Sequence, residues 1–136
     1  MKTSVKLNKN MHFTATLDGF EISMDADSKA GGEGNGVKPK GLTLVSLAGC
    51  TAMDVISILR KMRIEPDDFT IDVEADTSDE HPKVYTAIKL TYRLKGQNIQ
   101  RDKVEKAVSL SQEKYCGVSA MLKKAAPIDY EIVIED

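Results

Sequence analysis

The feature that most constrains this chain is an apolar run from Leu42 to Leu59, interrupted mainly by Ser, Thr, Gly and one acid, Asp54. Pro39 precedes the run and basic residues follow it, which predicts a helix over about residues 40–62 because proline suits a helix start and cations suit a helix end. Apolar side chains lie on every face of this helix, so every face must be buried. A chain of 136 residues can hardly surround such a helix, and we therefore expect a second subunit to cover part of it.

The same run has the marginal length of a membrane span. An aspartate at the bilayer centre costs about 2.5–3.5 kcal/mol, and Asp54 lies inside the run. We therefore interpret the segment as a buried helix and expect no membrane association. Residues 1–10 alternate apolar with basic and polar side chains and contain no apolar core of a secretory signal. The sequence thus predicts a cytoplasmic location.

The overall charge and composition exclude one large class of partner. Lys and Arg number 19 against 21 Asp and Glu, for a net charge of −2, and aromatic residues make up only 5% with no Trp. Nucleic-acid binding needs a concentrated positive field or aromatic stacking platforms. We therefore expect no nucleic-acid partner.

Segments of alternating apolar and polar residues flank the apolar helix on both sides. Period-two alternation is typical of half-exposed strands, and Asp18-Gly19 is a strong hairpin signal between two of them. The expected strands are residues 5–7, 13–17, 20–25, 71–76, 84–94 and 128–134. The order βββ-α-ββ-αα-β predicts an α+β fold with antiparallel sheets, and residues 1–136 form a single domain with no linker that divides it.

Two further helices are expected before the last strand. Residues 100–115 place apolar side chains, ending with Tyr115, on one helical face, and residues 118–124 place Met121 and Leu122 inward. The glycine-rich segment 27–38 is irregular. It is either a surface linker or a flap beside a site.

The chain has two cysteines, Cys50 and Cys116, and no C-x-x-C pair. In a reducing compartment they are either buried structural residues or a redox pair. Cys116 lies where one helix ends and the next begins, so the amides of residues 118–120 should point toward its sulfur, and a helix N-terminus favours thiolate. Asp54 lies one turn after Cys50 on the same face and should oppose a Cys50 thiolate.

Two stretches that contain these cysteines resemble the two cysteine motifs of the OsmC/Ohr family, the osmotically induced and organic-hydroperoxide-resistance proteins. They are residues 39–55, with Cys-Thr-Ala-Met-Asp-Val, and residues 110–122, with Tyr-Cys-Gly-Val-Ser-Ala-Met-Leu. The element order also matches, so the resemblance covers essentially the whole chain. The closest similarity is to the YhfA-like branch.

The resemblance implies an intertwined homodimer with central cysteine-bearing helices flanked by antiparallel sheets. It also implies thiol peroxidase chemistry on organic hydroperoxides. Cys50 would be the peroxidatic residue that becomes a sulfenic acid, and Cys116 would resolve it to a disulfide. A dithiol reductant of the lipoyl type would then regenerate the thiols. No metal or organic cofactor is implied.

The sequence departs from the family pattern at three places. Lys40 stands where active members have Glu, no Arg precedes Arg60, and Gly117 replaces a proline. In the family the missing Arg and Glu pair, and the Arg stabilises the thiolate. Lys40 could supply a cation and Glu33 a carboxylate, although Lys40 lies about 15 Å along the helix axis from Cys50.

These observations leave two hypotheses. The first is a two-cysteine thiol peroxidase. The second is a non-catalytic dimer of the same fold that binds a small apolar or thiol ligand, or acts as a weak redox sensor. His12 and His81 have no metal-ligand spacing with the cysteines, so we expect no metal site.

Overall fold

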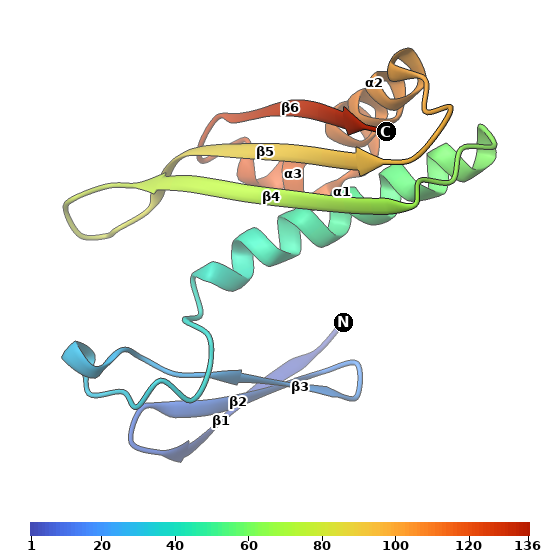
Figure 1. Cartoon of the computed structure of the whole chain (residues 1–136). Coiled ribbons are helices and arrows are strands. Elements are labelled where there is room, and N and C mark those ends of the chain that lie inside the picture. Colours follow the sequence, from blue (N-terminus) through green and yellow to red (C-terminus); the bar gives the residue numbers. More distant parts are fainter. The chain divides into compact units, whose positions relative to one another are not determined.

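The computed structural model describes all 136 residues, which form two compact units, residues 1–44 and 45–136. Figure 1 shows the elements in chain order. They are β1 (Thr3–Lys9), β2 (His12–Leu17), β3 (Phe20–Met24), a 3-10 turn (Ser28–Ala30), α1 (Gly41–Lys61), β4 (Asp68–Thr77), β5 (Tyr85–Lys95), α2 (Arg101–Leu110), a π-helical turn (Ser111–Tyr115), α3 (Gly117–Leu122) and β6 (Ile128–Glu135). This order confirms the predicted α+β class, while a single domain over residues 1–136 stays a prediction.

The first unit is built on the antiparallel sheet β1-β2-β3. Asp18 and Gly19 connect β2 to β3 with φ angles of 52° and 81°. Two consecutive positive φ values define the tight turn whose twist matches paired strands, and Asp-Gly adopts it readily. The predicted hairpin is therefore confirmed.

The glycine-rich segment after β3 is tied to its own sheet. The buried Asp25 carboxylate accepts hydrogen bonds from the backbone N–H groups of Glu33 and Asn35 at 3.3 and 3.0 Å. These bonds, with that of Asn35 foremost, lower the pKa of Asp25. A Cβ at Gly36 would fall 2.4 Å from the Ser23 carbonyl group, so only glycine fits this approach. The segment is an anchored loop.

The second unit carries a mixed sheet. Strand β5 is central, with β4 antiparallel on one side and β6 parallel on the other. The expectation of purely antiparallel sheets is therefore wrong for β6. The reason is the connection, because the helices between β5 and β6 form a crossover that returns the chain in the same direction.

The core between the sheet and α2 is built from buried residues of β5 and of the helix. They are Ile88, Leu90, Tyr92 and Leu94 on the strand and Val104, Ala107 and Val108 on the helix. Helix α2 thus lays its apolar stripe on the sheet, as its periodicity predicts.

Two inward placements predicted for the last helices are wrong. Residues 111–115 form a π-helical turn, which is wider than an α-turn and changes the phase of the side chains. Tyr115 is consequently 53% exposed. In the six-residue helix α3 the fully buried position is Ser119, and Met121 is 65% exposed while Leu122 is half-buried.

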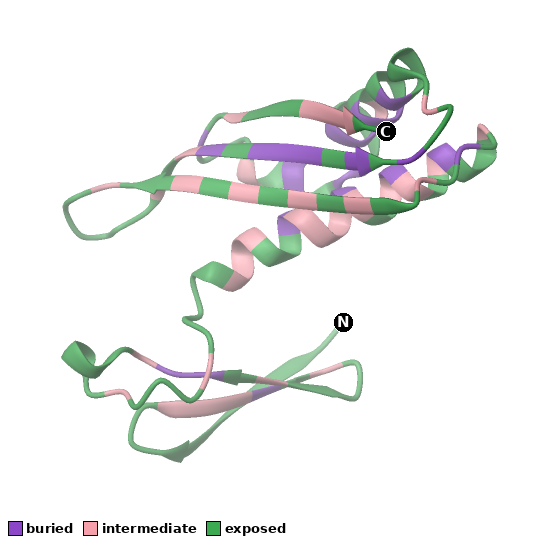
Figure 2. Cartoon of the chain, in the orientation of Figure 1, coloured by how far each residue is buried: buried purple, intermediate pink, exposed green.

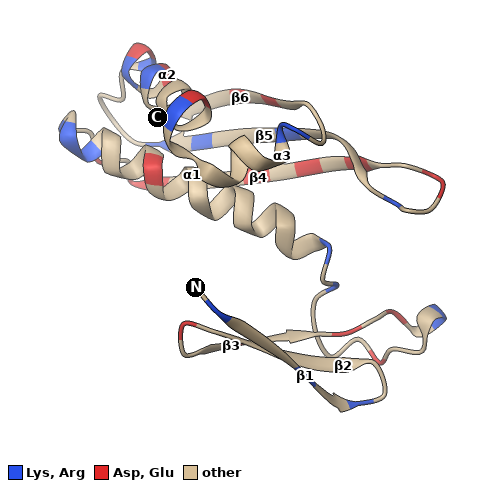
Figure 3. Cartoon of the chain, turned by 180° about the vertical axis from the view of Figure 1, so that it is seen from behind, with Lys and Arg blue, Asp and Glu red and all other residues tan.

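Helix α1 buries one stripe within this chain. The stripe consists of Leu47, Thr51, Val55 and Leu59 at a spacing of four. Val45 and Met53 remain 64% and 74% exposed, and a Cβ at Gly49 would meet no atom within 4 Å. Figure 2 shows this alternation of buried and exposed surface, and Figure 3 shows that most of α1 carries no charge.

The length and composition of α1 would also allow it to cross a membrane, a test that core helices of soluble proteins pass as well. The prediction that every face of α1 is buried is not met by this chain alone.

We propose that a second copy of the chain covers the exposed apolar side of α1. We expect sedimentation equilibrium to give twice the chain mass of 14.9 kDa for the wild type. Met53→Lys should shift the protein to the monomer mass, because burying an unpaired ammonium group is costly. Val84→Lys is the matched control, since Val84 is an exposed apolar residue outside α1. A monomeric wild type would contradict the proposal.

Candidate dithiol site

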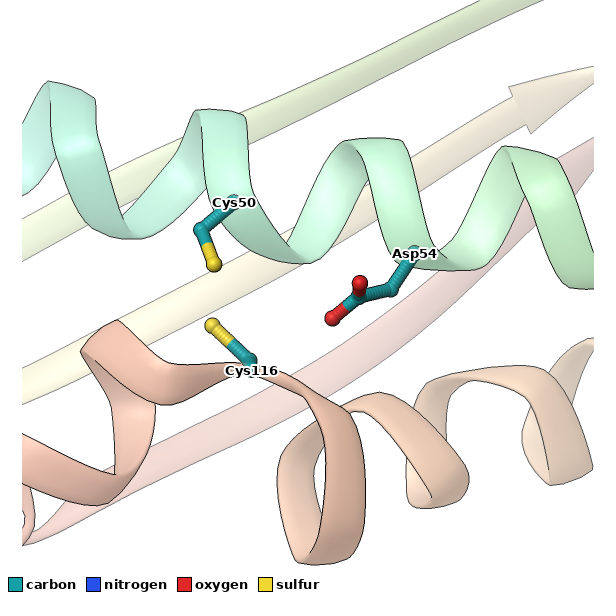
Figure 4. Close-up of side chains that lie close together, drawn as sticks. All are labelled: Cys50, Asp54 and Cys116. Atoms are coloured by element: carbon teal, nitrogen blue, oxygen red, sulfur yellow. The ribbon is translucent and has the colours of Figure 1, made fainter.

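The structure brings the two predicted cysteines together. Cys50 and Asp54 lie one turn apart on α1, and Cys116 lies between the π-helical turn and α3. The two sulfur atoms and a carboxylate oxygen of Asp54 all lie within 4.8 Å of one another (Figure 4). Both cysteines are free thiols, Cys116 buried and Cys50 half-buried. All three residues belong to the second unit.

Backbone amides of α3 contact both sulfur atoms. The Cys116 sulfur caps this helix by accepting a hydrogen bond from the Ser119 N–H at 3.3 Å. The Val118 N–H bonds to Cys50 instead, and the Ala120 N–H bonds to the Cys116 carbonyl oxygen. The predicted convergence of three amides on Cys116 is therefore confirmed for one of them.

The environment of Cys50 disfavours its thiolate. Burial raises the pKa of the Cys50 thiol, and the neighbouring Cys116 and Asp54 raise it further, while the Val118 N–H lowers it. The predicted opposition between Asp54 and a Cys50 thiolate is confirmed in direction.

A chain of buried hydroxyl groups leads to Asp54. The Ser111 hydroxyl donates to the Asp54 carboxylate at 2.9 Å and contacts the Thr51 hydroxyl at 2.7 Å. The Thr51 hydroxyl in turn contacts the Tyr92 hydroxyl at 2.7 Å. The Gln112 side-chain amide donates to Thr51 at 3.3 Å and to Tyr92 at 3.1 Å. The chain thus connects α1, β5 and the π-helical turn.

The direction of these hydrogen bonds follows by elimination, because each hydroxyl has a single proton. Ser111 gives its proton to Asp54, so Thr51 must donate to Ser111, and Tyr92 must donate to Thr51. The Thr51 and Tyr92 oxygens are then both acceptors toward Gln112, and its amide nitrogen indeed donates to both of them. Burial raises the pKa of Tyr92 to about 12, so its hydroxyl keeps the proton that starts the chain. All three hydroxyl protons point toward Asp54.

Sequence periodicity does not identify this row of hydroxyl groups. It places Thr51 and Ser111 on helices and Tyr92 on a strand, and gives none of them a further role. The available signals were a hydroxyl within the apolar run and the pair Ser111-Gln112 on the inner face of a helix just before Cys116.

The other predicted site residues belong to the first unit. Glu33 accepts a hydrogen bond from the Asn10 side chain, and Lys40 directly precedes α1. Their roles at the dithiol stay predictions. His12 bonds to Ser23, outside the cysteine cluster.

Cys50, Cys116 and Asp54 are also the residue types that bind zinc. They offer three ligand atoms, one fewer than a closed tetrahedral site requires. The expectation that the protein needs no metal stays a prediction.

Comparison with known proteins identifies the family. The model of the family described as OsmC-like protein matches residues 31–131. Protein YhfA of Escherichia coli K12 is 35% identical over 136 residues, covering 98% of each chain. The chain belongs to the OsmC-like family.

Solved structures of OsmC-like proteins and their relatives share the fold. A hypothetical protein from Aquifex aeolicus VF5 superposes with a TM-score of 0.83 at 33% identity, covering 99% of this chain and 97% of its own. An organic hydroperoxide resistance protein OsmC from Legionella pneumophila superposes with a TM-score of 0.71 at 17% identity, covering 97% and 95%. The predicted membership of the OsmC/Ohr family is confirmed.

The raised pKa of Cys50 has a measurable consequence. A pKa above the free value of about 8.5 leaves little thiolate at neutral pH, so alkylation of Cys50 should be slow at pH 7 and accelerate through alkaline pH. Iodoacetamide labelling of the reduced wild type, with each cysteine-containing peptide quantified by mass spectrometry, measures this directly. A half-maximal Cys50 rate at a pH below the free value of about 8.5 would contradict the raised pKa.

Proposed function

We propose that this protein reduces organic hydroperoxides as a two-cysteine thiol peroxidase. The observation that carries the proposal is the approach of the Cys50 and Cys116 sulfurs to within 4.8 Å. A disulfide needs an S–S separation of about 2.05 Å, so the proposal requires the two side chains to move toward each other. Membership of a family with hydroperoxide-resistance members supports the choice of substrate.

The reaction proceeds in three balanced steps. The Cys50 thiolate attacks the peroxide O–O bond, an alcohol leaves after taking up a proton, and Cys50 becomes a sulfenic acid. The Cys116 thiol then displaces the hydroxyl group, which forms a disulfide and releases water. A dithiol of the lipoyl type finally reduces the disulfide and is itself oxidised to a cyclic disulfide.

The difference in exposure between the two cysteines supports the assignment of their roles. Cys50 is half-buried and Cys116 is buried, so a peroxide from solvent reaches Cys50 first. Cys116 is held by the Ser119 N–H beside the sulfur that it must attack. This arrangement favours Cys50 as the peroxidatic and Cys116 as the resolving residue.

A specific observation favours the alternative of a non-catalytic binding protein. The first unit contains a pocket of about 550 Å³, a volume within the range of small-molecule sites. Its lining is mainly apolar and includes Val5, Met11, Phe13, Met24 and Pro39. The raised pKa of Cys50 also weakens the nucleophile on which a peroxidase depends.

Disulfide mapping separates the two functions. Reduced protein treated with one equivalent of cumene hydroperoxide should form an intramolecular Cys50–Cys116 disulfide within seconds, detected by peptide mass spectrometry. Cys50→Ser should abolish the reaction, whereas Cys116→Ser should stop at a Cys50 sulfenic acid that dimedone traps. Thiols that remain unreacted after minutes would contradict the peroxidase and favour the binding protein.

This chain lacks the family arginine that stabilises the thiolate, so another cation is needed near Cys50. We propose that Lys40 of the partner subunit supplies it, because Lys40 of the same chain lies about 15 Å along the helix axis from Cys50. Lys40→Ala should slow sulfenic acid formation about tenfold, the effect of about one unit in the Cys50 pKa, with Lys40→Arg retaining activity. The rate is measured by rapid mixing with cumene hydroperoxide in the Cys116→Ser background. Glu33→Ala tests the carboxylate in the same assay. Unchanged kinetics in either variant would remove that residue from the mechanism.

A further inference from the structure

The Asp54 carboxylate is placed to act on the cysteine pair. One of its oxygens lies within 4.8 Å of both sulfurs, a separation that one bridging water or a small side-chain movement can span. Figure 4 shows this side chain beside the pair, with an oxygen directed toward Cys116. Ser111 holds the carboxylate by a hydrogen bond to Oδ2.

The two chemical steps make opposite demands on a carboxylate at this position. Peroxide attack needs a Cys50 thiolate, which the negative charge of Asp54 opposes. Disulfide formation needs the Cys116 thiol to lose its proton as it attacks, and a carboxylate can accept that proton. Asp54 therefore hinders the first step and can assist the second.

We propose that Asp54 is the general base of disulfide formation, and that Tyr92, Thr51 and Ser111 position it through their one-directional hydrogen-bond chain. This inference rests on the proposed peroxidase function. Asp54 would then assist disulfide formation, although its negative charge disfavours the Cys50 thiolate in the first step.

In this step the proton of Cys116 passes to Asp54 and then to solvent. Asp54 takes the proton of the Cys116 thiol while the Cys116 sulfur attacks the sulfur of the Cys50 sulfenic acid. The S–O bond breaks, and the departing hydroxide takes up a proton from solvent water. Asp54 then releases its proton to solvent, so the net products are the disulfide and one water.

The hydroxyl chain keeps the base in place. Thr51 is fully buried, as are Tyr92 and Ser111, and the Gln112 amide anchors the far end. Because every hydroxyl proton in the chain is committed toward Asp54, the Ser111 hydroxyl can serve the carboxylate only as a donor. Ser111 is therefore a positioning residue, and Asp54 is the group that receives the proton.

The test separates the two steps in time. Reduced Asp54→Asn protein is mixed with cumene hydroperoxide, quenched at intervals, and analysed for dimedone-trapped sulfenic acid and for disulfide by mass spectrometry. We expect sulfenic acid to form at least as fast as in the wild type, because a negative neighbour of Cys50 is gone. Disulfide formation should slow about 100-fold, within the usual range for general acid–base catalysis, and sulfenic acid should accumulate.

Two further variants distinguish proton transfer from a structural role. Asp54→Ala should regain part of the disulfide rate when formate is added, because the small carboxylate replaces the missing base. Ser111→Ala should slow disulfide formation about tenfold, below the usual range for loss of the base itself, and change sulfenic acid formation far less, with Ser57→Ala, an exposed serine on α1, as the control. These measurements remain informative if one of the variants fails to fold.

The outcomes also separate this inference from the proposed function. A wild type that forms sulfenic acid and disulfide, with Asp54→Asn forming disulfide at the same rate, overturns the role of Asp54 and leaves the peroxidase standing. A wild type that forms no sulfenic acid overturns both. Equal slowing of both steps in Asp54→Asn, with no rescue of Asp54→Ala by formate, also overturns the general base.

Discussion

The candidate site depends on the hydrogen bonds that the buried hydroxyl of Thr51 makes. Thr51 is the polar member of an otherwise apolar stripe with which α1 packs in the second unit. Its oxygen lies 2.7 Å from the hydroxyls of both Tyr92 and Ser111. It therefore joins the helix to the central strand and to the π-helical turn. Because Cys50 precedes Thr51 directly, this contact also sets where the Cys50 sulfur lies relative to Cys116.

The π-helical turn completes the same arrangement from the other side. It places Ser111 and Gln112 inward, and it ends with the Cys116 N–H bonded to the Ser111 carbonyl at 2.8 Å. The chain then becomes extended at Cys116 before α3 begins. An uninterrupted α-helix would point the side chains of residues 111–116 in other directions. The position of the Cys116 sulfur therefore depends on the wider turn.

The sequence was sufficient to predict the elements and the cysteine pair, because periodicity and the family motifs report local structure and motif order directly. Strands β1 to β6, helix α1 and the Asp18-Gly19 turn all occur where the patterns place them. The parallel direction of β6 was not predictable from alternation, which is the same for both strand directions.

The hydroxyl chain was beyond prediction for a different physical reason. Its members are distant in sequence, and each one looks locally like an ordinary helix or strand residue. The contact between Thr51 and Tyr92 exists only because the stripe of α1 and the buried face of β5 meet. The inward prediction for Tyr115 failed for a related reason, since no periodicity rule anticipates a π-helical turn.

The two demands on helix α1 are in tension. Its exposed apolar side calls for a partner surface, while its Cys50 needs to become a thiolate. Covering the helix would remove more water from Cys50, and loss of water is already the largest cause of its raised pKa. A partner that contributed only apolar surface would therefore make the thiol less reactive. A reactive dimer requires that the covering surface also bring a cation or further hydrogen-bond donors to Cys50, whereas a binding protein requires only the apolar contact. For the proposed dimer, the chemistry of the covering surface thus distinguishes a peroxidase from a binding protein.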